Sequence, residues 1–124
     1  MWGVNKVVLV GHLGKDPDIR YLAENISVVS FPLATSENIT VDGRKVEETE
    51  WHNIVMWRSL AEAAYKFLKK GKLIYLEGKI RTRSFDDKQG VQRTITEVLA
   101  ENFTVLGRSS DFNSADNTAY HSTD

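Results

Sequence analysis

The 124-residue chain has the length of one domain, and its 16 Lys and Arg against 17 Asp and Glu leave a formal net charge of −1. This balance excludes a uniformly basic chromatin-type protein and a polyacidic disordered protein, but it allows a local basic groove. The absence of Cys excludes disulfides, a thiolate nucleophile and zinc bound by cysteine. No apolar run is long enough for a membrane span and no signal peptide is visible, so we expect a soluble cytoplasmic domain.

The first half of the chain is predicted to form strands. β-branched residues predict a strand over residues 4–13. A turn follows it, and a second strand is predicted over residues 27–35. Asp42-Gly43 is a hairpin signal within the polar stretch 36–50, which we expect to form a protruding β-loop. A third strand is predicted at residues 50–57.

One helix is predicted after the third strand. Ser59 and Glu62 fit a capping box, and Gly71 marks the expected C-terminal end. The buried face is predicted from helical spacing, at Leu60, Ala64, Phe67 and Leu68. Two further strands, at residues 73–85 and 91–106, are separated by a turn.

The predicted order is β-β-β-α-β-β, an all-β protein with one helix. A five-stranded Greek-key OB-fold barrel has this order. A ferredoxin-like βαββαβ arrangement is excluded by the lack of a second helix. After residue 106 the composition shifts to Ser, Asp, Asn and Thr. We therefore expect a folded domain over residues 1–106 and a short, flexible, disordered tail over residues 107–124.

Two tryptophans share one face of the third predicted strand. Trp51 and Trp57 lie six residues apart, an even number, so their side chains project from the same face, together with Asn53. His52 then points to the opposite face. Exposed indoles of this kind favour a binding surface. The alternatives are core positions in a large barrel or positions in a subunit interface.

The fourth predicted strand carries a row of cations. Ile74, Leu76 and Ile80 share one face and are expected in the core. The other face carries Tyr75, Glu77, Lys79, Arg81, Arg83 and Phe85. Such a row is by itself typical of a solvated strand face. Beside two tryptophans it favours a surface on which cations follow phosphates and aromatic rings stack on bases.

Catalytic and metal chemistry is not indicated. His12, His52 and His121 show no metal-ligand spacing, and His52 fits a hydrogen-bonded core or interface histidine. Asp86-Asp87 is typical of a turn, because adjacent strand residues point apart. No combination of nucleophile, base and oxyanion donors is apparent, so we expect neither an enzyme nor a cofactor or metal.

Six stretches carry a family resemblance. They are VNKVVLVG at 4–11, LGKDPDIRY at 13–21, LATSE at 33–37, ETEWH at 48–52, LIYLEG at 73–78 and IRTR at 80–83. Together, and in this order, they resemble the bacterial single-stranded DNA-binding protein family. The resemblance implies an OB fold and a homotetramer that wraps single-stranded DNA during replication, recombination and repair, without catalysis. It also implies a cytoplasmic, nucleoid-associated protein.

The resemblance implies roles for individual residues. Trp51, Trp57 and Phe85 fall on stacking positions, whereas Ile39 stands at a further stacking position where the family has Trp. The predicted phosphate contacts are Arg20, Lys79, Arg81 and Arg83, and Asn53 and Lys6 complete the DNA-binding set. Arg81 and Arg83 match family positions, Lys79 rests on strand parity, and Lys6 has a subunit-interface role as its alternative. His52 and Tyr75 are expected at that interface.

The tail departs from the family pattern, because residues 107–124 lack the clustered acidic tip of members that recruit partners. Two explanations stay open: the chain is truncated, or it is a plasmid, phage or accessory member without that tip. Replication and repair proteins also stay open as partners. No membrane partner is expected. The alternative function is a dimeric OB-fold module of replication restart or assembly, which acts mainly through protein partners. A tetramer would favour DNA binding, and a stable dimer would favour the alternative.

Overall fold

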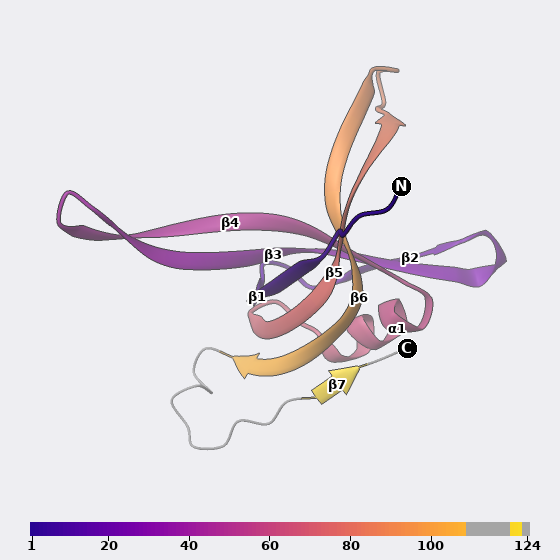
Figure 1. Ribbon diagram of the computed structural model, residues 1–124. Helices are drawn as coiled ribbons and strands as arrows, with labels where there is room; N and C mark the ends of the chain where they lie inside the picture. Colours follow the sequence, from indigo (N-terminus) through magenta and orange to yellow (C-terminus); the bar gives the residue numbers. More distant parts are fainter. Residues whose placement is uncertain (109–119, 123–124) are drawn as a thin grey trace.

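The computed structural model describes residues 1–108 and 120–122. Its strands are β1 (Val7–Leu13), β2 (Asp18–Leu22), β3 (Ile26–Val41), β4 (Arg44–Trp57), β5 (Lys72–Asp86), β6 (Gln92–Arg108) and β7 (Tyr120–Ser122). The helical segments are the 3-10 helix η1 (Ala23–Asn25) and the α-helix α1 (Arg58–Phe67). In Figure 1, α1 lies in the lower half of the molecule, above β7, and two long hairpins extend away from the centre.

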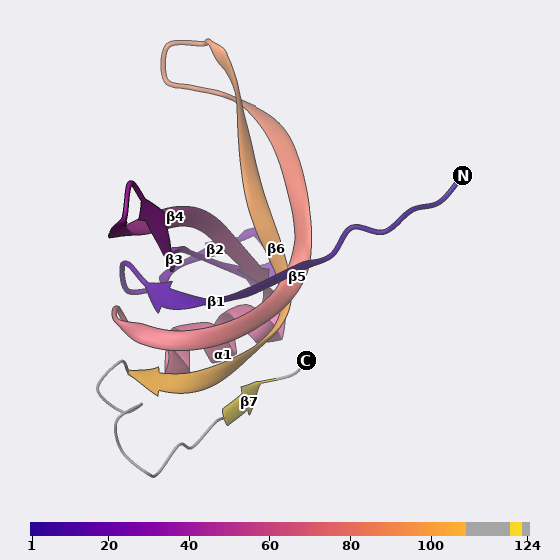
Figure 2. The ribbon, with the colours of Figure 1, turned by 60° about the vertical axis from the view of Figure 1, so that its left-hand side comes forward.

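Five strands close into a barrel, visible in Figures 1 and 2. Neighbouring strands follow the order β1-β5-β6-β4-β3, and β1 also pairs with β3 at His12–Ala34 and Leu13–Leu33, which closes the sheet. β4 and β6 run parallel where Ile54 faces Val98, and the other barrel pairings among the described strands are antiparallel. The predicted β-β-β-α-β-β barrel is confirmed.

Two glycines allow strands to approach closely in the barrel. A Cβ on Gly11 would overlap the carbonyl of Ala34, where β1 meets β3. A Cβ on Gly78 would overlap the backbone at Leu99, next to the register shift between β5 and β6. Only a residue without a side chain permits these backbone contacts.

The core fills the barrel interior and the contact with α1. Its fully buried side chains include Phe103, Leu33, Ile54, Met56, Leu68, Ile74, Leu76 and Val29. Two predicted core residues are exposed: Ile80 at 51% and Phe67 at 45%. Ile80 follows Gly78 at the point where β5 leaves the barrel, so solvent reaches both faces of the strand. Ala61 is buried on α1 instead of Phe67.

The predicted helix ends are wrong in detail. α1 begins at Arg58, and no side-chain hydrogen bond caps it within the described chain, so the capping box does not form. The helix ends at Phe67, four residues before Gly71. Gly71, with φ of 89°, instead lies in the link to β5 and donates its N–H to the carbonyl of Leu13 at 2.8 Å. A tertiary contact therefore uses the glycine that the sequence assigned to a helix cap.

Both long hairpins match their predictions, although they extend further. β3 and β4 pair continuously from Val28–Trp57 to Val41–Arg44, and the turn residues Asp42 and Gly43 have positive φ, as a tight hairpin turn requires. The protruding β-loop is therefore a regular two-stranded ribbon, on the left of Figure 1. β5 and β6 form the second hairpin, at the top.

Two short strands have no counterpart in the sequence analysis. β2 pairs with Ile26–Ser30 of β3, where only a turn was expected before the second strand. β7 pairs with Phe103–Val105 of β6, and β6 continues to Arg108, two residues past the predicted domain boundary. Residues 109–119 and 123–124 of the predicted tail lie outside the described residues. None of the described helices is long and apolar enough to span a membrane.

Candidate nucleic-acid interface

A groove of about 930 Å³ crosses five strands on one side of the barrel. β2 and β3 supply one wall, β4 supplies the middle, and β5 and β6 supply the other wall. Five of the predicted DNA-binding residues line it: Arg20, Asn53, Trp57, Arg81 and Arg83. The sequence could not show that β2 and the base of the β5–β6 hairpin face one another across β4.

The charge of the groove is more balanced than strand parity suggests. Its ionisable lining residues are Lys15, Arg20, Arg81 and Arg83 and, opposing them, Asp16, Asp18 and Glu97. Four cations against three carboxylates leave a net charge of +1. Arg20 already contacts Asp18, with 3.4 Å between Nε and Oδ2. The groove can attract phosphate, but most of its cations have a protein partner beforehand.

Trp57 and Trp51 lie at different depths of this surface. Trp57 ends β4 and is half-buried in the groove, and its indole N–H is buried without a hydrogen-bond partner among the described residues. Trp51 is 58% exposed, which excludes a core position. Its ring lies against Gly14, and a Cβ on Gly14 would also meet Pro32, a groove residue, so Trp51 stands at the rim.

Gly14 makes room for the Trp51 ring. A Cβ at this position would overlap two ring carbons of Trp51, so Gly14→Ala must displace the indole. We expect this substitution to weaken oligo-dT binding by about 3- to 10-fold, a part of the roughly 1–3 kcal/mol that one stacked base contributes. Fluorescence titration measures the effect. Gly3→Ala is the matched control, because a Cβ there meets nothing within 4 Å. Equal affinities of the two variants would contradict the placement of Trp51.

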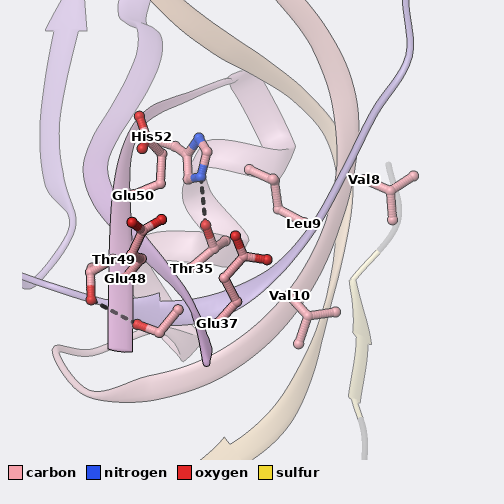
Figure 3. A pocket seen from close by; sticks show the side chains of 10 residues that line it. Val8, Leu9, Val10, Thr35, Glu37, Glu48, Thr49, Glu50 and His52 are labelled. Carbon is pink, nitrogen blue, oxygen red and sulfur yellow. Dashed lines mark hydrogen bonds between the residues drawn. The ribbon is translucent and has the colours of Figure 1, made fainter. Parts of the chain in front are cut away.

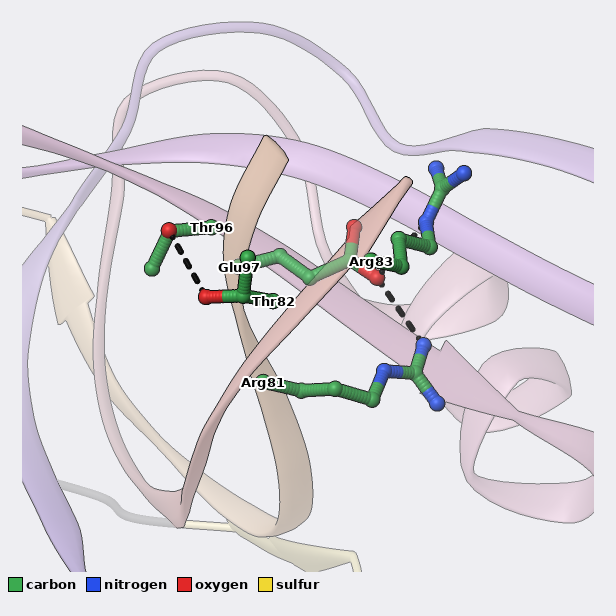
Figure 4. Close-up of polar contacts among 5 residues, drawn as sticks. All are labelled: Arg81, Thr82, Arg83, Thr96 and Glu97. Atoms are coloured by element: carbon green, nitrogen blue, oxygen red, sulfur yellow. Dashed lines mark hydrogen bonds and ion pairs between the residues drawn. The ribbon is translucent and has the colours of Figure 1, made fainter. Parts of the chain in front are cut away.

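Arg81 and Arg83 converge on Glu97, as Figure 4 shows. Arg81 Nη2 lies 2.9 Å and Arg83 Nε lies 3.0 Å from the same carboxylate oxygen, Oε1. Glu97 is only 3% exposed, which is unusual for a carboxylate. Glu97 is not among the residues predicted from the sequence, because nothing in the local pattern shows which β6 position faces the two arginines.

The remaining predicted contacts lie outside the groove. Phe85 is 39% exposed on the β5–β6 hairpin, and its ring centroid lies 5.7 Å from Arg83 Cζ, so Arg83 connects the groove to this ring. Lys79 is exposed and forms no ion pair within the described part of the chain. Lys6 is bound to Glu77 at 2.7 Å, and this hydrogen bond raises the pKa of Lys6. The structure thus favours Phe85, more than Lys6, as an extension of the groove.

Asp87 organises the tip of the hairpin that carries Phe85. Its carboxylate accepts hydrogen bonds from Arg93 Nε at 2.7 Å and from the backbone N–H groups of Gln89 and Val91, both at 2.9 Å. The bond from Arg93, followed by the backbone bonds, lowers the pKa of Asp87 in the folded state. Protonation of this carboxyl group is therefore less favourable in the folded chain than in the unfolded chain.

This lowered pKa predicts a pH dependence of stability. The contribution of Asp87 is fully present above its unfolded pKa of about 4, and it is lost as the pH falls through the lower folded pKa. Asp87→Asn should therefore destabilise the protein at neutral pH, and the difference from the parent should shrink below about pH 4. Urea unfolding across this range measures it, with the exposed neighbour in Asp86→Asn as control. A difference that is constant with pH would contradict the assignment.

Ile39 and Trp51 lie on opposite faces of the β3–β4 ribbon. The cross-strand pairs place Trp51 beside Ala34, whereas Ile39 pairs with Val46. Because alternate residues face opposite sides, Ile39 and Trp51 point away from each other. The loss of a ring at position 39 therefore removes no neighbour of Trp51.

The predicted interface residues lie near the free edge of β1. His52 Nε2 lies 2.8 Å from Thr35 Oγ1, and this pair lines a concavity with Val8 and Val10, as Figure 3 shows. Tyr75 is the cross-strand partner of Val10. Val8 and Val10 are 53% and 49% exposed. His52 and Tyr75 are therefore separated from the groove and lie beside an exposed apolar strand.

A closed five-stranded barrel with aromatic and basic side chains across its strands defines an OB-fold nucleic-acid-binding architecture. The model of the single-strand binding protein family matches residues 4–106, and the chain belongs to this family.

Known relatives agree with this assignment. A single-stranded DNA-binding protein of Neisseria meningitidis serogroup A is 48% identical over 105 residues, which cover 84% of this chain and 60% of that protein. Single-stranded DNA-binding protein 1 of Xylella fastidiosa is 41% identical over 122 residues, or 97% of this chain and 90% of that protein. A solved Plasmodium falciparum SSB complex with ssDNA is similar at a TM-score of 0.72 and 31% identity, covering 80% and 88% of the two chains. The chain spans about 60% of the length of the Neisseria relatives.

Proposed function

We propose that this protein binds single-stranded DNA without sequence preference and protects it during replication, recombination and repair. Bases stack on Trp51, Trp57 and Phe85, while Arg81 and Arg83 contact phosphates. The observation that carries the proposal is the groove across β2–β6, which joins a half-buried indole, an amide and three arginines on one continuous surface. Stacking is tolerant of sequence because every base has a π-face.

The family relatives support the same substrate. The Neisseria and Xylella proteins are single-stranded DNA-binding proteins by name, and the similar Plasmodium falciparum SSB was solved with ssDNA. The matched region, residues 4–106, contains every residue assigned to the groove. We propose residues 1–106 as the DNA-binding unit. We further propose that it acts without catalysis, in the cytoplasm and on nucleoid DNA, with replication and repair proteins as open partners.

We also propose that the chain assembles as a homo-oligomer, a tetramer as in the family resemblance. Residues 7–11 of β1 pair with β5 on one edge, and their other edge has no partner strand within the described chain. This stretch carries exposed Val8 and Val10. An exposed apolar strand edge is a template for pairing with a second copy. His52 and Tyr75 stand beside this edge. Light-scattering mass distinguishes a tetramer from the stable dimer expected of a replication-restart module.

Titration with labelled dT oligomers of increasing length, at two salt concentrations, tests DNA binding. We expect affinity to rise with length until the groove is filled, and to fall with salt because bound phosphates release counterions. Poly-dA and poly-dC should bind as well, since stacking needs no particular base. A duplex of equal length is the control. Equal affinity for duplex and single strands would reject the proposal, and so would binding confined to one base.

A further inference from the structure

Glu97 is the buried carboxylate of the groove, and the guanidinium groups of Arg81 and Arg83 both donate a hydrogen bond to one of its oxygens. Arg81 Nη2 and Arg83 Nε reach Oε1 at 2.9 Å and 3.0 Å. The side chain of Glu97 is 2% exposed, against 36% for Arg81 and 51% for Arg83. The carboxylate thus lies beneath the two arginines, on the protein side, while the arginines face solvent.

The hairpin register holds Glu97 in this place. Glu97 pairs directly with Arg81 across β5 and β6, and Arg83 is its diagonal neighbour on the same face. On the opposite face Thr82 and Thr96 are hydrogen-bonded through their hydroxyl oxygens at 3.0 Å, visible in Figure 4. The contact of the two arginines with one carboxylate is therefore built into the strand pairing.

The two arginines keep donors for a ligand. Arg83 uses Nε for Glu97, and its terminal amino groups make no hydrogen bond that the described residues show. Arg81 uses one terminal amino group, and its Nε is buried without a partner among the described residues. The contact with Glu97 is thus the side-chain hydrogen bond that Arg81 makes among the described residues.

We infer that Glu97 is a fixed counter-ion that sets the DNA affinity of the groove and its dependence on salt. The inference rests on the proposed function, because it concerns the same groove. Two guanidinium charges and one carboxylate leave a single surplus charge at the Arg81–Arg83 pair. A phosphate bound there gains less Coulomb energy than it would from two unopposed cations, and it displaces fewer bound counterions.

Glu97→Gln tests the inference, because glutamine keeps the acceptor oxygen and removes the charge. We expect oligo-dT affinity at low salt to rise by about 3- to 10-fold, and the slope of log K against log salt concentration to steepen by about 1. Glu101→Gln is the matched control, since it removes the same charge from an exposed β6 position outside the groove. If Glu97 has a purely structural role, Glu97→Gln changes the thermal unfolding of the protein, while its slope of log K against log salt concentration equals that of Glu101→Gln. This result would overturn the inference.

A second pair of variants tests the same charge balance, and its first member, Arg83→Gln, keeps Glu97 in place if Glu97→Gln folds poorly. Arg83→Gln leaves Arg81 neutralised by Glu97, so its salt slope should be shallower by about 1. The double variant Arg83→Gln/Glu97→Gln restores one surplus charge and should recover much of the parent slope. Double-variant binding no better than that of Arg83→Gln would overturn the inference. A parent protein that binds no oligo-dT would instead reject the proposed function.

Discussion

Replacement of Trp51 and Trp57 together by alanine is expected to weaken oligo-dT binding by at least about 30-fold. Each stacked ring contributes roughly 1–3 kcal/mol per base, so the loss of two rings corresponds to about 2–6 kcal/mol. Trp51 is 58% exposed at the rim, and Trp57 lines the groove, so both rings are placed to meet bases. Fluorescence anisotropy of a labelled oligonucleotide measures the loss without relying on tryptophan emission.

Trp2→Ala is the matched control for the double variant. Trp2 is 92% exposed in the segment before β1 and does not line the groove, so its loss should leave affinity within about twofold of the parent. Trp51→Phe/Trp57→Phe should retain most of the affinity, because phenylalanine keeps a π-face. Unchanged binding by the double alanine variant, with circular dichroism that shows a folded protein, would contradict the stacking model.

Phe103→Ala is expected to destabilise the protein by about 3–5 kcal/mol. The side chain is 1% exposed on β6, in the cluster that fills the barrel, and truncation would leave a cavity there. Domains of this size are stable by only about 5–15 kcal/mol, so the variant would be close to unfolding at physiological temperature. Urea unfolding monitored by circular dichroism gives the change in free energy.

Phe67→Ala is the comparison, because it replaces the same side chain by alanine at an exposed position. Phe67 is 45% exposed on α1 and contacts the Lys66 ammonium at 5.4 Å from its ring centroid. Its truncation should cost no more than about 1 kcal/mol. If both variants lose a similar free energy of unfolding, the position of Phe103 in the core is contradicted.

Element types and strand faces were predictable wherever the local pattern is strong. The alternation around Trp51 and Trp57 is confirmed at Trp51, whose ring is exposed, and at Ile54 and Met56, which are fully buried. The hairpin turn at Asp42-Gly43 is also confirmed, because these residues accept positive φ at little cost. These predictions depend on the two-residue period of a strand and on turn chemistry, and both are local properties.

The partners of the cations were not predictable, because they depend on register. A register shift of one residue would pair Glu97 with Thr82 or Ile80 and place it on the face opposite to Arg81 and Arg83. The observed register pairs Arg81 with Glu97 and Phe85 with Arg93. Likewise, the parity of Lys79 with Arg81 predicted one continuous row, yet Lys79 does not line the groove. β5 leaves the barrel near Gly78, and a pattern of alternation contains no information on that change of direction.

The length and near-zero charge of this chain excluded only extremes of composition. Strand periodicity placed two tryptophans on one face, and the order of the elements predicted a five-stranded barrel. Which strands are neighbours, how the barrel closes at Gly11, and where buried Glu97 neutralises the arginines were decided by tertiary structure. The physical reason is that alternation and turn residues act within a few positions along the chain. Register and charge pairing, in contrast, arise between strands that are distant in sequence and meet only when the barrel closes.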